Sequence, residues 1–132
     1  MNIFGIGTDI VSIDRIKNSL KNRNFIKRIF NEKEILKCNK INNKINCYAK
    51  RYAAKEAFSK ALGTGISNGI KFNEIVVLNK KSGKPYINII GQTKIALNKK
   101  LKGKKSKISL SLSDEKKYAV AFVTISLWIK KN

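Results

Sequence analysis

The first ten residues alternate between large apolar side chains and small or polar ones. This period of two predicts a β-strand over residues 2–10, because successive side chains of a strand point to opposite faces. Asp9 falls on the same face as Gly5 and Gly7. Those glycines leave room for another backbone or a ligand to approach closely, so the pattern predicts an acidic side chain beside a closely approached face.

Apolar residues then recur at helical spacing over three segments. A first helix is expected to begin after Ser12, a residue type that often caps helices. A second is expected over residues 24–38, initiated near residues 31–34, and is followed by a polar loop over residues 40–46. The third and best defined helix covers residues 47–62 and ends at Gly63. One side of it is apolar, and the polar residues expected on the other side are Arg51, Lys55, Glu56, Ser59 and Lys60.

The second half of the chain is predicted to consist mostly of strands. Residues 74–79 and 84–90 flank a short Lys-Lys-Ser-Gly segment, which is typical of a hairpin. A short helix is expected over residues 92–101, and two further strands over residues 108–113 and 118–126. Helices first and antiparallel strands later predict an α+β fold.

The composition supports one folded domain over residues 1–132. Hydrophobic residues make up 42% of the chain, and a domain of this length buries roughly two-thirds of the surface that its unfolded chain exposes. No signal peptide or membrane-spanning segment is recognisable in the sequence. We therefore expect a cytoplasmic protein with no membrane partner.

The formal net charge is +21, with 29 Lys plus Arg against 8 Asp plus Glu. Part of this lysine excess is the bias that an AT-rich genome produces by codon drift. The remainder would attract polyanions such as nucleic acid, an acidic protein or a phosphorylated small molecule. Lysine runs such as residues 103–107 could contact phosphates, but such runs are more often solvated surface. They lack interleaved aromatic residues on which bases stack, so nucleic acid is not the expected partner.

The residue types that are absent exclude several chemistries. The chain has no His, which excludes Ser-His-Asp and Cys-His catalysis and His-rich zinc sites. Its two cysteines, Cys38 and Cys47, lack CxxC spacing, and we expect them to be reduced thiols rather than a disulfide. Any bound metal must then be held by oxygen ligands, which favours Mg²⁺ or Mn²⁺.

Two acids in this basic chain are candidates for such ligands. Taken alone, Asp9 could simply enter or cap a helix, and Glu56 could pair with Lys60 four residues later on the helix surface. Together with the glycine-spaced strand, the Ala-rich helix and the glycine turn, they predict a divalent-metal site surrounded by positive charge. A phosphate-bearing substrate suits such a site.

Two other phosphate-binding motifs are excluded by the sequence, and two other functions stay open as alternatives. A dinucleotide-binding GxGxxG motif is excluded because its third glycine position is Ile10, and no GxxxxGK[ST] loop occurs. Charge alone would permit a basic nucleic-acid-binding domain. The carboxylate pair alone would also permit another Mg²⁺-dependent phosphotransferase or a nucleotide hydrolase.

Two longer motifs point to a family. Residues 4–11, Phe-Gly-Ile-Gly-Thr-Asp-Ile-Val, and residues 50–61, Lys-Arg-Tyr-Ala-Ala-Lys-Glu-Ala-Phe-Ser-Lys-Ala, closely resemble the bacterial holo-acyl-carrier-protein synthases. Segments 63–66, 83–86 and 109–114 continue the resemblance in order. It implies the 4′-phosphopantetheinyl transferase fold and an activity in fatty acid biosynthesis. The 4′-phosphopantetheine group of coenzyme A would pass to a serine of apo acyl carrier protein, releasing adenosine 3′,5′-bisphosphate.

The resemblance also implies roles for individual residues. Asp9 and Glu56 would hold Mg²⁺ on the pyrophosphate of coenzyme A, and Lys60 would neutralise the departing phosphate. The residues implied to contact coenzyme A are Arg51, Lys60, Gly63, Thr64, Lys84 and Pro85. The residues implied to dock the acidic carrier protein are Arg15, Lys17 and Lys21.

Two further implications concern assembly and the catalytic base. The resemblance implies a homotrimer with active sites between subunits, Asp9 coming from one chain and Glu56 from its neighbour. Ser109 stands where the family commonly has a His, so the role of that His in deprotonating the acceptor serine cannot be transferred. We expect Glu56, directly or through a water that it orients, to act as the base.

Overall fold

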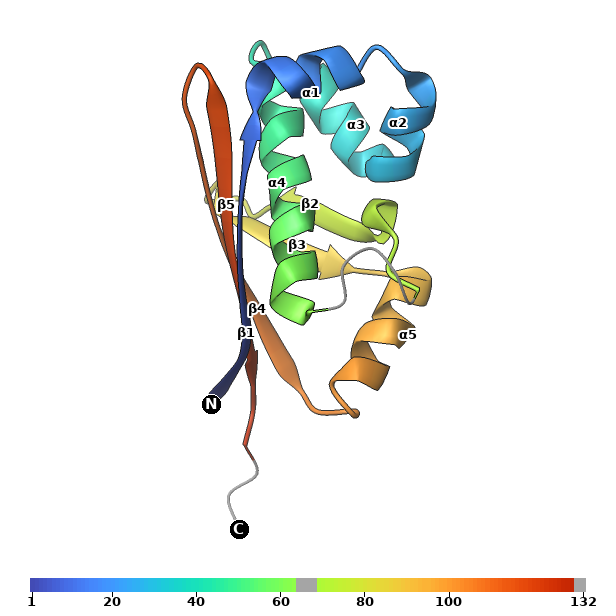
Figure 1. The fold of residues 1–132 in the computed structure, drawn as a ribbon, viewed down its shortest axis with the longest axis vertical. Coiled ribbons are helices and arrows are strands. Elements are labelled where there is room, and N and C mark those ends of the chain that lie inside the picture. Colours follow the sequence, from blue (N-terminus) through green and yellow to red (C-terminus); the bar gives the residue numbers. More distant parts are fainter. Residues whose placement is uncertain (64–68, 130–132) are drawn as a thin grey trace.

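The computed structural model describes residues 1–63 and 69–129, which form an α+β fold as predicted. One short 3-10 helix, η1, accompanies the helices and strands (Figure 1). In chain order the elements are β1 (Asn2–Ser12), α1 (Ile13–Ser19), α2 (Arg23–Ile29), α3 (Glu32–Asn39), α4 (Lys44–Leu62), η1 (Phe72–Glu74), β2 (Ile75–Asn79), β3 (Pro85–Ile89), α5 (Gly91–Lys100), β4 (Ser106–Asp114) and β5 (Tyr118–Leu127).

A three-stranded antiparallel sheet forms one side of the molecule, in the order β1-β5-β4. Helix α4 runs along one face of this sheet, and α1–α3 gather at one end of α4 (Figure 1). The β2–β3 hairpin forms a second, two-stranded sheet beyond α4. Helix α4 is therefore the central element: it packs on the main sheet and also contacts α3 and β2, while β3 lies beside β4. Among the described residues, no helix has the length and apolar character that a membrane span requires.

The glycine face of β1 lies directly against α4, as the alternation predicted. A Cβ atom added to Gly5 would collide with the carbonyl oxygen of Ala61, and one added to Gly7 would collide with that of Ala57. Asp9 continues the same face, since it pairs with Ala121 of β5 two residues beyond the Gly7–Val123 pair. The strand thus carries its carboxylate directly onto the helix.

The prediction for the polar side of α4 is only partly correct. Arg51, Lys55 and Ser59 are buried, whereas Glu56 is half-buried and Lys60 is exposed. The reason is that α4 is covered on two sides, by the main sheet and by the elements around β2. Three of the five polar residues therefore point into a second packed layer, and only a narrow strip of the helix remains open.

Two helix boundaries differ from the prediction. The helix expected over residues 24–38 is two helices, α2 and α3, because Asn31 caps the second with a capping box that Glu34 completes. The loop expected over residues 40–46 is shorter, since α4 already begins at Lys44. By contrast Gly63 ends α4 with a φ of 86°, in the left-handed conformation predicted for a glycine stop.

The expectation of reduced thiols is wrong in this structure, which joins Cys38 and Cys47 in a disulfide. Cys38 lies in the last turn of α3 and Cys47 in the first turns of α4, and both are buried. The packing of these two helices brings the Cα atoms to 5.5 Å, within the range that a disulfide requires. The spacing of the two cysteines along the sequence does not indicate how close their Cα atoms lie in the fold.

Candidate active site

The structure brings three predicted residues together where β1 crosses α4. The ammonium group of Lys60 donates to the Oδ1 atom of Asp9 at 3.2 Å and to the backbone carbonyl oxygen of Thr8 at 3.0 Å. The Asp9 side chain is 15% exposed and the Lys60 side chain is 56% exposed. A partly shielded carboxylate therefore lies beside a cation that remains open to solvent.

Glu56 lies one turn before Lys60 on the same face of α4. Its Oε1 atom accepts a hydrogen bond of 3.1 Å from the hydroxyl of Tyr52, one further turn back. Burial first, and then the Glu56 carboxylate, raises the pKa of the Tyr52 phenol above its ordinary value, and Asp9 adds to this while Arg15 opposes it. Both carboxylates and one arginine thus act on the same hydroxyl within one chain.

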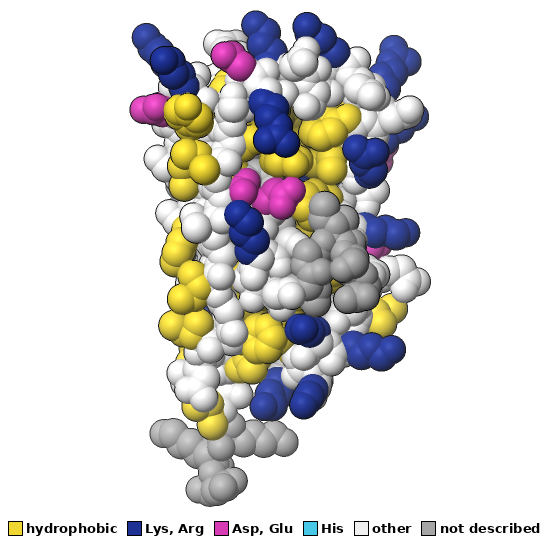
Figure 2. Space-filling view, viewed as in Figure 1, with side chains coloured by type: hydrophobic (Ala, Val, Ile, Leu, Met, Phe, Trp, Pro, Cys, Tyr) yellow, Lys and Arg dark blue, Asp and Glu magenta, His cyan; other side chains and the backbone are white. Residues whose placement is uncertain are grey.

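This arrangement corrects the expectation that Asp9 and Glu56 come from neighbouring subunits. Because the glycine face lets β1 lie on the backbone of α4, both carboxylates share one open strip of a single chain. Figure 2 shows adjacent acidic side chains near the middle of this face, with basic side chains on either side of them. The acidic pair is complete without a second copy.

The two carboxylates fit a hard divalent cation that shares its ligands with a substrate. Among the described residues, no group of three or more His, Cys, Asp and Glu side chains is placed to hold a metal. Nor does any hydrogen bond described for this part of the chain use Asp9 Oδ2 or Glu56 Oε2. Mg²⁺ is commonly bound by one or two carboxylates together with water and substrate phosphates, which matches this donor set.

Arg51 lies away from the carboxylates and does not point to the open strip. The residue is only 4% exposed, and its guanidinium donates to the carbonyl oxygen of Cys47 at 3.3 Å and to Oδ1 of Asn79 at 2.9 Å. Its Nε atom has no hydrogen-bond partner among the described residues, and burial lowers the pKa of the group. Asn79 pairs with Pro85 across the β2–β3 hairpin, next to Lys84. Arg51, Lys84 and Pro85 therefore form a second group, at the hairpin.

The remaining predicted residues fall in three places. Gly63 follows the last turn of α4 beyond Lys60, and Thr64 lies outside the described residues. The predicted docking residues are exposed on α1 and just after it, at the end of β1 that carries Asp9: Arg15, Lys17 and Lys21.

Ser109 is exposed on β4, on the face of the sheet opposite to Asp9. It pairs with Thr124 of β5, which in turn pairs with Ile6 of β1, whereas Asp9 belongs to the alternate, helix-facing set. Within one chain its hydroxyl therefore cannot stand in for a base beside Glu56.

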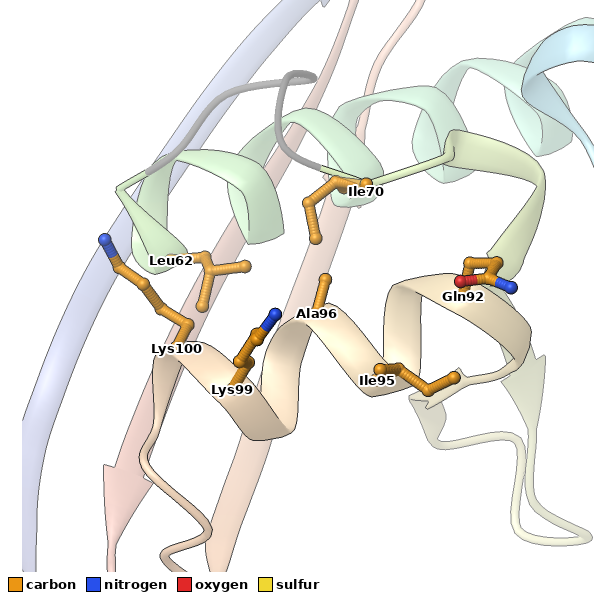
Figure 3. A pocket seen from close by; sticks show the side chains of 8 residues that line it. Leu62, Ile70, Gln92, Ile95, Ala96, Lys99 and Lys100 are labelled. Carbon is orange, nitrogen blue, oxygen red and sulfur yellow. The ribbon is translucent and has the colours of Figure 1, made fainter.

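A separate hollow lies between the end of α4 and helix α5 (Figure 3). Its volume is about 430 Å³, and its lining includes apolar side chains such as Leu62 and Ile95 together with Lys99 and Lys100. None of the predicted site residues that the structure describes lines it. The hollow is therefore distinct from the carboxylate site.

Sequence reasoning missed two groups that the structure adds to this site. One is the backbone carbonyl of Thr8, which no side-chain pattern could indicate. The other is the hydroxyl of Tyr52, which was detectable because Tyr52, Glu56 and Lys60 follow each other at intervals of four residues on one helix face.

Comparison with known proteins supports the motif evidence. The family model of the 4′-phosphopantetheinyl transferase superfamily matches residues 5–123. The chain belongs to this superfamily. It is 51% identical over 125 residues to the holo-acyl-carrier-protein synthase of Pelagibacter ubique, covering 95% of this chain and 98% of that protein. A second relative, from Clostridium tetani, carries the same name and is 47% identical, with 93% and 95% covered.

Solved structures agree with this assignment. The holo-acyl-carrier-protein synthase of Neisseria meningitidis has a TM-score of 0.84 and 39% identity, covering 94% of this chain and 98% of that one. The Helicobacter pylori enzyme, solved in complex with coenzyme A, has a TM-score of 0.77 and 31% identity, with 92% and 99% covered. A non-enzymatic nucleic-acid-binding domain and an unrelated phosphotransferase are not favoured by these matches.

Proposed function

We propose that this chain transfers the 4′-phosphopantetheine group from coenzyme A to a serine hydroxyl of apo acyl carrier protein, releasing adenosine 3′,5′-bisphosphate. The names of its relatives and the coenzyme A complex of one structural neighbour support this activity. The observation that carries it in this chain is the open strip on which Asp9, Glu56 and Lys60 converge. That strip joins two carboxylates to a cation, as transfer at a phosphoryl centre requires.

Asp9 and Glu56 would hold Mg²⁺ as the cofactor of this reaction. When bound there, the ion would neutralise negative charge on the pyrophosphate and polarise the phosphorus–oxygen bond that breaks. The support for it is the donor set, which consists of carboxylate oxygens in a chain without His. Two protein ligands leave the remaining positions to the substrate and water.

Lys60 would provide a second positive charge beside the departing phosphate. Its side chain is 56% exposed, so it can reach toward a ligand and still remain near Asp9. Glu56 would accept the proton of the attacking serine hydroxyl, directly or through a water that it orients. The nucleophile belongs to the carrier protein, which explains why the chain needs no activated serine or cysteine of its own.

The carrier protein would dock beside this strip, on the basic residues of α1. Arg15 already acts electrostatically on Tyr52, so the predicted docking helix and the carboxylates are neighbours. Exposed Lys17 and Lys21 extend the positive surface. Such a surface accelerates encounter with an acidic partner. The reaction would serve fatty acid biosynthesis in the cytoplasm.

We also propose a homotrimer, with active sites at the subunit interfaces. Its support is the outer face of the main sheet, where large apolar side chains on β1 and β5 are exposed: Ile6, Ile10, Tyr118, Val120 and Phe122. Contiguous apolar surface of this kind commonly marks a protein interface. Since one chain carries both carboxylates, a neighbour would contribute coenzyme A contacts, for example from the hairpin at Lys84 and Pro85. Sedimentation equilibrium tests the assembly, and a stable monomer would contradict it.

The transfer reaction can be tested by the intact mass of an apo acyl carrier protein. Incubation with the chain, Mg²⁺ and coenzyme A should add one phosphopantetheine group. Glu56→Gln should lower the rate by at least about 100-fold at saturating Mg²⁺, the scale on which general acid–base groups act. Glu32→Gln is the matched control, because Glu32 is exposed at the start of α3 and outside the strip. No added mass with the wild-type chain would overturn the proposed activity, and a near-wild-type rate for Glu56→Gln would overturn its role as base.

A further inference from the structure

The hydroxyl of Tyr52 donates a hydrogen bond to the carboxylate of Glu56. The bond is 3.1 Å long and ends on Oε1. An ionised carboxylate can only accept, so the phenol is the donor and the orientation of the bond is fixed. One carboxylate oxygen is thereby held toward Tyr52, and no hydrogen bond among the described residues uses the other, Oε2.

The ring that carries this hydroxyl is itself held by two other elements. Its centroid lies 6.0 Å from that of Phe25 in α2, with the rings tilted, and 6.3 Å from that of Phe72 in η1, edge to face. Both separations lie in the range of favourable aromatic pairs. The position of the hydroxyl is therefore set by packing from outside α4, and it does not depend on Glu56 alone.

The geometry points to Tyr52 as a positioning residue of the metal site: its hydroxyl orients Glu56 so that Oε2 faces the Mg²⁺ position beside Asp9. This inference rests on the proposed role of Glu56 as a metal ligand. Ligating carboxylates are generally hydrogen-bonded by a second group, and loss of such a group lowers metal affinity or activity by about 10- to 100-fold. In this role Tyr52 acts through Glu56, as a positioning residue and not as a catalytic one.

The test compares two tyrosines of the same helix. Tyr52→Phe removes the hydroxyl and keeps the ring between Phe25 and Phe72. Tyr48→Phe is the matched control, because Tyr48 lies one turn earlier and donates instead to Asn39 Oδ1 at 2.8 Å, away from the strip. Mn²⁺ serves as the probe, and its dissociation constant is measured by electron paramagnetic resonance on the full chain. We expect about tenfold weaker Mn²⁺ binding for Tyr52→Phe and no change for Tyr48→Phe.

A second measurement asks whether Tyr52 acts through Glu56. In a Glu56→Gln background, Tyr52→Phe should cause no further loss of Mn²⁺ affinity, since the two residues act as one unit. A crystal structure of Tyr52→Phe should show the Glu56 carboxylate rotated away from its position in the wild-type chain.

Three outcomes would overturn the inference. The first is an Mn²⁺ affinity of Tyr52→Phe within twofold of that of the wild-type chain, when the wild-type chain binds the metal and modifies the carrier protein. In that case the proposed function stands, and only the role of Tyr52 fails. The second is an equal loss in Tyr52→Phe and Tyr48→Phe, which would mark a general effect on the helix. The third is a wild-type chain that neither binds Mn²⁺ nor modifies the carrier, in which case the proposed function fails with it.

Discussion

Among the described residues, three lysines of helix α4 pair with carboxylates, and two of these pairs, those of Lys55 and Lys60, contrast most strongly in burial. Lys55 lies 2.7 Å from Glu34, and both side chains are completely buried. Lys60 lies 3.2 Å from Asp9, and those side chains are 56% and 15% exposed. The two lysines belong to one short motif, yet one faces the second layer of the fold and the other faces the open strip.

The buried pair has no capacity left for a ligand. The ammonium group of Lys55 also donates to the carbonyl oxygens of Phe72, at 2.8 Å, and Ile75. The second oxygen of Glu34 accepts from the backbone N–H of Val77 at 3.1 Å. These bonds tie α3, α4, η1 and β2 together. A pair enclosed by such bonds holds elements in place. The open pair keeps solvent access, and no hydrogen bond among the described residues uses its Asp9 Oδ2 atom, so it can bind a ligand.

The largest expected effect comes from breaking the buried pair on one side. Lys55→Met leaves the Glu34 carboxylate buried without its cation, so the free energy of unfolding should fall by about 3–5 kcal/mol. Urea denaturation followed by circular dichroism measures this loss.

The double variant Glu34→Gln/Lys55→Met removes both charges and keeps an amide that can still accept from Val77. It should recover a large part of the stability lost in Lys55→Met, because no uncompensated charge remains. A Lys55→Met chain as stable as the wild type would show that the pair does not hold the layers together.

The same pair should impose a dependence of stability on pH. Burial lowers the pKa of Lys55 from 10.5 to about 8, with Glu34 opposing the shift. Between these values the unfolded chain binds the proton more readily, so this group makes the free energy of unfolding rise with pH. Its contribution is complete above 10.5 and is lost as the pH falls through about 8.

Urea denaturation at several pH values across this window tests the sign. The wild-type chain should gain stability relative to Glu34→Gln/Lys55→Met as the pH rises, since the double variant lacks this lysine. Parallel curves for the two chains would show that Lys55 does not titrate as the geometry indicates.

The difference between the pairs marks how far sequence reasoning reaches in this chain. Periodicity predicted the strand that carries Asp9, the helix that carries Glu56 and the glycine that ends it, because these depend on local pattern. It placed Lys55 and Lys60 on the same polar side. Their separation depends on β2 and η1, which cover one flank of α4 from a later part of the chain.

The prediction of the site was limited in the same way, because it depends on distances between elements that are far apart in the sequence. The motifs identified Asp9, Glu56 and Lys60; in the structure Lys60 bonds to Asp9, and Glu56 lies one turn before Lys60 on the same helix face. Division of the carboxylates between subunits was wrong, since it ignored how closely the glycine face of β1 approaches α4. Arg51 was expected on the polar side of its helix and is instead buried beside the hairpin, because residue type alone does not determine burial.

The smallest effect on stability should come from removing the lysine of the open pair, Lys60. This variant also distinguishes the functions of the two pairs most clearly. Lys60→Met removes a cation that is more than half exposed, so screening should limit the change in the free energy of unfolding to less than about 1 kcal/mol. Carrier modification should nevertheless slow by at least about tenfold, because the charge beside the departing phosphate is lost. Lys94→Met, at an exposed position of α5, is the matched control and should change neither quantity. If Lys60→Met instead unfolded as readily as Lys55→Met, or transferred at the wild-type rate, the open pair would be a second structural bond, and the contrast along α4 would not separate fold from function.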